Sequence, residues 1–216
     1  MLRMISSLRG IDLHATDGHL GKVQDLFFED RDWTVLYMSV DTAQWLPGRR
    51  VLVPPATFGE ADWVERTINV MVTREEIETS PEIHLHESIT REQEVAYFAH
   101  FGWACLWNGE LRGVDEIIGS SLVGQDEKPV GVVSDLVVDE VWIIRYVVVA
   151  VGDGLEERLT LIPVRLLANK WGSGGHSVLA DSESLASAPQ FDPRSAIQRD
   201  HEEDLHRHYS APSYWE

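Results

Sequence analysis

The sequence contains a single cysteine among its 216 residues. One cysteine can form neither an internal disulfide nor a Cys-x-x-Cys zinc site, which excludes the disulfide frameworks of small secreted domains. We therefore expect a cytoplasmic protein. Cys105 stands between Ala104 and Leu106, where it is expected to pack as a small apolar side chain.

Basic residues are also scarce, because 18 Lys and Arg stand against 36 Asp and Glu, a formal net charge of −18. Such a surface repels phosphate, which disfavours direct binding to nucleic acids and adsorption to anionic membranes. Apolar runs such as residues 147–151 are far shorter than the roughly 20 residues of a membrane-spanning helix. Residues 1–5 lack the apolar stretch of a signal peptide. We expect a soluble protein with no membrane insertion.

Sequence motifs of catalysis are missing as well. The chain has no Gly-x-Ser-x-Gly nucleophile turn and no Gly-x-x-x-x-Gly-Lys-Ser/Thr phosphate loop. We therefore expect no catalytic residues, no cofactor and no enzymatic activity.

The sequence does contain an internal repeat of about half its length. The offset between aligned residues stays within 108 to 110 along the whole chain, and glycine, proline and tryptophan recur. The repeat predicts two copies, residues 1–107 and 108–216. The aligned pairs include Gly10 and Gly119, Trp33 and Trp142, Tyr37 and Tyr146, Pro54 and Pro163, Glu94 and Glu202, and Trp107 and Trp215.

Each copy shows strand patterns first and helix patterns last. Residues 21–28, 34–40, 50–53 and 67–72 are rich in β-branched and aromatic residues or alternate in polarity, as are 130–139, 142–151 and 158–162. Capping boxes at Thr73–Glu76 and Thr90–Gln93 then predict two short helices, and residues 197–209 a third. The expected fold is mainly β, with two tandem six-stranded barrels, each followed by short helices. Closing each barrel would remove the exposed strand edges.

These residues resemble the PRC-barrel family, well over residues 10–81 and less well over 119–189. The segments that carry the resemblance are residues 21–28, Trp33, Tyr37, residues 40–42, 45–49, 51–54 and 73–81. The second copy departs from the pattern, since Ala150 replaces Asp41 and Gly154 replaces Trp45. The resemblance implies a small barrel that contacts proteins and has no catalytic residues. The family includes the cytoplasmic domain of the photosynthetic reaction centre H subunit and the C-terminal domain of the ribosome maturation factor RimM.

The histidines near the C-terminus suggest one candidate metal site. Glu202 and His206 lie four residues apart, so a helix would place them on one face, with His208 nearby. Imidazole and carboxylate are ligands of divalent transition metals. A solvated, histidine-rich helix is the favoured interpretation. His84 and His86 form a second, separate cluster.

Asp25 and Asp135 occupy equal places in the repeat. As carboxylates they suit acid–base chemistry, but binding backbone N–H groups at a strand end is the favoured role. Trp33 and Trp142 are expected in the core. The predicted partner contacts are Trp45, Leu46, Trp103 and Trp107.

The function expected from these features is non-enzymatic: a protein-binding or scaffold protein that acts through acidic barrel surfaces. Its partner would be another protein or a second copy of the chain. An accessory subunit of a membrane photosynthetic or electron-transfer complex is the alternative, by analogy with the H subunit. A metal-dependent hydrolase is the least favoured.

Overall fold

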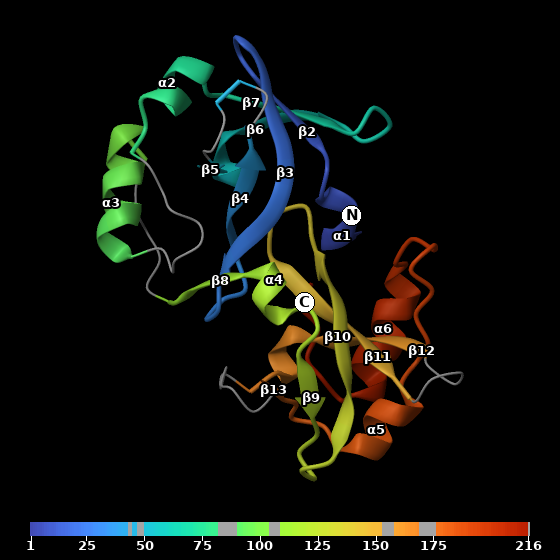
Figure 1. Ribbon diagram of the computed structural model, residues 1–216. Helices are drawn as coiled ribbons and strands as arrows, with labels where there is room; N and C mark the ends of the chain where they lie inside the picture. Colours follow the sequence, from blue (N-terminus) through green and yellow to red (C-terminus); the bar gives the residue numbers. More distant parts are fainter. Residues whose placement is uncertain are drawn as a thin grey trace. The chain divides into compact units, whose positions relative to one another are not determined.

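The computed structural model describes residues 1–42, 45–46, 50–81, 90–103, 109–152, 158–168 and 176–215. The chain divides into two compact units (Figure 1). The N-terminal unit is Ser7–Gly113, and the C-terminal unit joins Met1–Ser6 to Val114–Glu216. The predicted division after residue 107 falls just before the boundary at Gly113.

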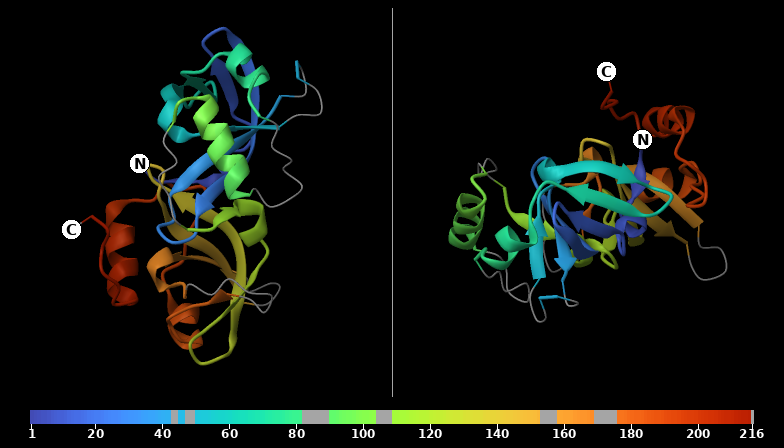
Figure 2. Two further views of the ribbon diagram at one scale, coloured as in Figure 1. Left: turned by 90° about the vertical axis from the view of Figure 1, so that its left-hand side faces the viewer. Right: turned by 90° about the horizontal axis from the view of Figure 1, so that it is seen from above.

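The N-terminal unit contains a seven-stranded sheet in the order β5-β4-β3-β2-β7-β6, with β8 also paired to β3. Helix α3 covers one face of this sheet (Figure 2), where its Tyr97 and Phe98 pack against Tyr37 of β4 and Leu52 of β5. The elements are β2 (Asp12–Ala15), β3 (Gly18–Glu29), β4 (Val35–Asp41), β5 (Arg50–Val53), β6 (Phe58–Asp62), β7 (Thr67–Val70), α2 (Arg74–Glu78), α3 (Arg91–His100) and β8 (Leu111–Gly113).

The C-terminal unit contains a six-stranded sheet in the order β12-β11-β10-β9-β13, with β1 also paired to β10. Its elements are β1 (Arg3–Met4), α4 (Val114–Ile117), β9 (Ser121–Val123), β10 (Pro129–Val138), β11 (Ile144–Val151), β12 (Arg158–Pro163), β13 (His176–Ser177), α5 (Ser182–Ser187) and α6 (Arg199–His208). The short helix α1 (Ile5–Leu8) spans the boundary between the two units.

Local sequence signals placed most of these elements correctly. Strand β11 is apolar on both faces, and it lies between β10 and β12 as predicted. Both capping boxes are formed: the Glu76 amide donates to Thr73 Oγ1 over 3.1 Å, and the Gln93 amide donates to Thr90 Oγ1 over 3.3 Å. Helix α6 falls within the predicted residues 197–209.

The predicted closure of six-stranded barrels is wrong for the part of the chain described. Neither strand order returns to its first strand, so both sheets stay open. Other groups cover the edges that closure would have paired. At β5, the Tyr97 hydroxyl accepts from the Leu52 amide over 3.2 Å and donates to the Leu52 carbonyl over 2.7 Å. At β12, Gln190 forms a bridge to Thr160.

The two sheets share one pattern of strand pairing. Each residue pair between β3 and β4, from Lys22 and Asp41 to Phe28 and Val35, has a counterpart between β10 and β11, and both ladders have β-bulges at corresponding places. Tyr37 lies opposite Phe27, and Tyr146 lies opposite Val137. The parallel pairs of β2 with β7 correspond in the same way to those of β9 with β13.

The two short strands β1 and β8 are exchanged between the halves of the sequence. Arg3 of β1 pairs with Val138 in the C-terminal unit. Arg112 of β8, 109 residues later, pairs with Phe28, the counterpart of Val138, in the N-terminal unit. Each unit therefore contains one short strand that comes from the other half of the sequence.

Unusual backbone conformations recur at the same spacing. Trp33 and Trp142 both adopt positive φ, 59° and 64°, which is rare for bulky residues. Gly10 and Gly119 share a left-handed conformation. Trp33 is buried and stacks on Phe28, as predicted for a core residue, whereas Trp142 is half-buried.

Candidate functional site: a buried tyrosine–glutamate cluster

A cluster of polar side chains lies where α6 packs on the C-terminal sheet. Glu202 and His206 are one turn apart on α6 and share its buried face, as their spacing predicted. Tyr146 comes from the centre of β11, where its side chain is fully buried. After α6, the chain brings Tyr214 to the same carboxylate.

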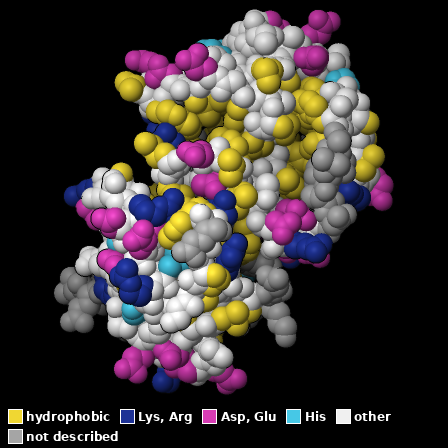
Figure 3. Space-filling model, turned by 180° about the vertical axis from the view of Figure 1, so that it is seen from behind, with side chains coloured by type: hydrophobic (Ala, Val, Ile, Leu, Met, Phe, Trp, Pro, Cys, Tyr) yellow, Lys and Arg dark blue, Asp and Glu magenta, His cyan; other side chains and the backbone are white. Residues whose placement is uncertain are grey.

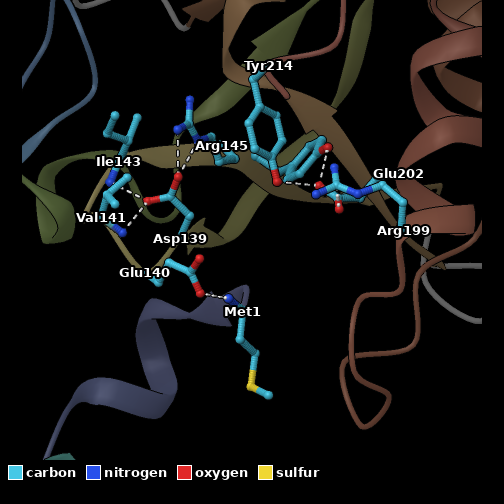
Figure 4. A network of polar contacts seen from close by, with 10 residues as sticks. Met1, Asp139, Glu140, Val141, Ile143, Arg145, Arg199, Glu202 and Tyr214 are labelled. Carbon is cyan, nitrogen blue, oxygen red and sulfur yellow. Dashed lines mark hydrogen bonds and ion pairs between the residues drawn. The ribbon is translucent and has the colours of Figure 1, made fainter. Parts of the chain in front are cut away.

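The Glu202 carboxylate is the acceptor at the centre of this cluster (Figure 4). Its Oε1 accepts from the Tyr146 hydroxyl over 2.9 Å and from the Tyr214 hydroxyl over 2.7 Å. Its Oε2 lies 3.1 Å from Nη1 of Arg199, one turn earlier on α6. Glu202 is only 3% exposed, so these partners replace the water that the charge would otherwise keep.

His206 joins the cluster from its other side. Its Nε2 lies 3.0 Å from the Tyr146 hydroxyl, and its Nδ1 lies 3.3 Å from the Ala211 carbonyl. The ring also packs edge-to-face against Trp215, with 4.8 Å between centroids. His206 thus connects the sheet, α6 and the segment after α6.

Two arginines pack on the aromatic rings that follow α6. The Arg145 guanidinium lies 4.2 Å from the centre of the Tyr214 ring and is bound by Asp139 at 2.6 Å. Arg199 lies 4.0 Å from the centre of the Trp215 ring. Figure 4 also shows the Met1 ammonium bound to Glu140.

Burial and the Glu202 charge both act against ionisation of the tyrosines. Burial, followed by the nearby carboxylate, holds the pKa of Tyr146 well above its usual value. The pKa of Tyr214 is raised by burial and by its hydrogen bond to Glu202. Burial raises the pKa of Tyr209 to about 12, although Thr160 and Arg158 act in the opposite direction.

These raised pKa values predict a loss of stability at alkaline pH. Tyrosines of the unfolded chain ionise near pH 10, so the unfolded state loses protons that the folded state keeps. The contribution of Tyr146 is complete below about pH 10 and decreases as the pH rises above it. We expect Tyr146→Phe to reduce the slope of unfolding free energy against pH by up to about 1.4 kcal/mol per pH unit. Denaturant unfolding between pH 9 and 11 measures this, and equal slopes for both proteins would contradict it.

The structure brings Glu202 and His206 together at the Tyr146 hydroxyl and separates His208 from them. Glu202 and His206 face Tyr146 rather than an open position, whereas Nε2 of His208 lies 2.8 Å from the Ser184 carbonyl. No group of three metal-binding side chains occurs among the residues described. His84 and His86 lie outside the described residues.

Most of the predicted partner contacts are held within the N-terminal unit. The Trp45 indole donates to the Leu20 carbonyl over 2.6 Å, and Arg74 lies 4.3 Å from its ring centre. Trp103 stacks on Phe101 at 4.3 Å. Leu46 is half-buried, and Trp107 lies outside the described residues.

The two repeated aspartates have different partners. Asp135 accepts from the Ser6 amide over 3.2 Å and from the Leu136 amide over 2.8 Å, the backbone role that we favoured. Asp25 binds the Arg9 guanidinium at 2.9 Å.

The N-terminal unit repeats three side chains of this cluster, Tyr37, Glu94 and Arg91, but Leu36 and Leu106 stand where Arg145 and Tyr214 do. Tyr37 on β4 and Glu94 on α3 are buried, and Arg91 lies 3.5 Å from Glu94. Phe98 replaces His206 and packs edge-to-face on Tyr37, with 5.2 Å between centroids. The repeat in the sequence aligned the residues of the two copies, but it did not indicate that Glu202 and His206 attach α6 to the sheet through polar contacts with Tyr146.

Comparison with known proteins finds a similarity over about a third of the chain. In the part of the chain described, no helix is long and apolar enough to cross a membrane. No curated protein matches the sequence. The matching region lies in the half expected to resemble the family less well: residues 110–183 are similar to the PRC-barrel domain.

Proposed function

We propose that the chain is a duplicated PRC-barrel-like protein that works without catalysis, as an acidic scaffold for a basic protein partner. Each copy would be one sheet with a helix anchored on it.

The shared strand register supports the duplication most strongly. A β-sheet does not need bulges at any particular place, so bulges at corresponding places in the β3–β4 and β10–β11 ladders support a common origin of the two halves. The exchanged strands β1 and β8 and the left-handed Trp33 and Trp142 add to this support.

The internal bonding of the buried cluster supports a structural role for its polar groups. Both oxygens of Glu202 and the hydroxyl of Tyr146 are directed at one another or at Arg199, Tyr214 and His206. Groups that bind one another in this way hold α6 on the sheet.

The net negative charge of the chain is the reason for proposing a basic partner. The excess of 36 acidic over 18 basic residues produces a negative field that attracts cationic surfaces and repels nucleic acids. Figure 3 shows Asp and Glu side chains spread over the face drawn instead of gathered in one patch.

Affinity purification tests this proposal. The full chain, immobilised, should retain a basic protein at low salt and release it as the salt concentration rises, because screening shortens the range of the charges. An unrelated protein of equal net charge is the control bait. Binding to both baits alike, or retention that salt does not change, would contradict the proposal.

A further inference from the structure

The hairpin between β6 and β7 ends in a fixed turn. Oδ1 of Asp62 accepts from the amide of Val64 over 2.9 Å and from the amide of Glu65 over 3.0 Å. Arg66 adopts a left-handed conformation, and its guanidinium donates to the Arg9 carbonyl over 2.9 Å. These bonds limit the turn to one conformation, so binding there would cost little conformational entropy.

The turn presents two large apolar side chains. Val64 is 89% exposed and Trp63 is 40% exposed. Hairpin turns usually carry glycine, asparagine or aspartate, because these residues suit turn geometry and water. Val64 buries almost nothing in this structure and so adds little to folding. Tryptophan is one of the residues enriched among the contact hot spots of protein interfaces.

Carboxylates surround these two side chains. Glu60, Asp62 and Glu65 are all exposed and lie within three residues of Trp63. Arg66, the basic residue within three positions of Trp63, donates to the Arg9 carbonyl. A complementary surface would therefore offer an apolar pocket bordered by Lys and Arg.

We propose that the β6–β7 turn, residues 62–65, is the docking element for the partner, inserting Trp63 and Val64 into an apolar pocket bordered by basic side chains. This inference rests on the proposed scaffold function. A second copy of the chain fits poorly, because it carries the same net charge of −18.

The β10–β11 turn supplies a matched control. Oδ1 of Asp139 accepts from the Val141 amide over 3.0 Å, and Val141 is 61% exposed beside Glu140. The neighbouring Trp142 is half-buried, so this turn presents one exposed apolar side chain instead of two.

Photo-crosslinking in the host cell identifies the occupant. A photoreactive phenylalanine derivative is placed at position 64 of the full chain, and at position 141 as the control. Position 64 should form an adduct with a protein, and the cross-linked peptide should lie at an apolar site with Lys or Arg nearby. An adduct with a second copy, a lipid or an acidic site overturns the proposal, as does equal labelling from position 141.

Titration of the chain with the partner that cross-linking has identified, purified in its free form, then measures how much the turn contributes to binding affinity. Trp63→Ala should weaken binding by about 30-fold or more, as expected for a hot spot. Val64→Asp should weaken it by at least about tenfold, and Val141→Asp by less than about twofold. If all three variants bind like the original chain, the turn is not the docking element although the scaffold function stands. If affinity purification finds no partner, both proposals fail.

Discussion

Replacing Gly131 with alanine should destabilise the C-terminal unit by about 3 kcal/mol or more. A Cβ at this position would lie 2.1 Å from the Ala150 carbonyl oxygen and 3.0 Å from the carbonyl carbon. Both atoms are backbone of the neighbouring strand β11, so no side-chain rotation relieves the contact. Strands β10 and β11 would have to separate where Gly131 pairs with Val151, at one end of their ladder. Denaturant unfolding of the full chain measures the loss.

Gly59→Ala is the matched control for this substitution. A Cβ at Gly59 would meet the Asn69 carbonyl oxygen at 3.6 Å, an ordinary contact on the outer strand β6. We expect its unfolding free energy to stay within about 1 kcal/mol of the original chain. Equal effects of the two substitutions would show that the strand approach at Gly131 is not as close as described.

The second large effect is expected from Glu202→Ala, which should cost about 3 kcal/mol of unfolding free energy. The substitution removes the acceptor of two tyrosine hydroxyls and the partner of Arg199. Tyr146 is fully buried, so its hydroxyl cannot recover the bond with water. Arg199 is 47% exposed and regains solvent, which keeps the loss below that of a wholly buried pair.

Two further substitutions serve as a control and as a test of the Glu202 charge. Glu203→Ala, the exposed neighbour on α6, should change stability by no more than about 0.5 kcal/mol. Glu202→Gln retains an acceptor oxygen but removes the charge, so an intermediate loss is expected. If Glu202→Ala and Glu203→Ala behave alike, the cluster does not anchor α6.

Features with a local signal could be predicted from the sequence. The Thr73 and Thr90 capping boxes are contained in four residues each, and β11 is recognisable because it is apolar on both faces. The positions of these elements therefore followed from propensity and periodicity.

Features that depend on pairing distant residues could not be predicted. Strands β1 and β8 are two and three residues long, too short for a periodic pattern, and each pairs with the other half of the sequence. Barrel closure was expected because the backbone groups of an open edge need hydrogen-bond partners. At β5 the Tyr97 hydroxyl, 45 residues from Leu52 in the sequence, supplies such a partner to the Leu52 carbonyl. The bond from Tyr146 to Glu202 spans 56 residues.

Amide hydrogen exchange of the full chain tests the two equivalent units most directly. In the N-terminal unit the Gly10 amide donates to the Val23 carbonyl over 2.8 Å, and the Val23 amide donates to the Ile11 carbonyl over 2.9 Å. In the C-terminal unit, Gly119 donates to Val133 over 2.8 Å, and Val133 donates to Ser120 over 2.9 Å. We predict that all four amides exchange slowly, because each opens only when its own sheet does. The account would be contradicted if the two amides of one unit exchanged slowly while the matching amides of the other unit exchanged as fast as in an unfolded chain.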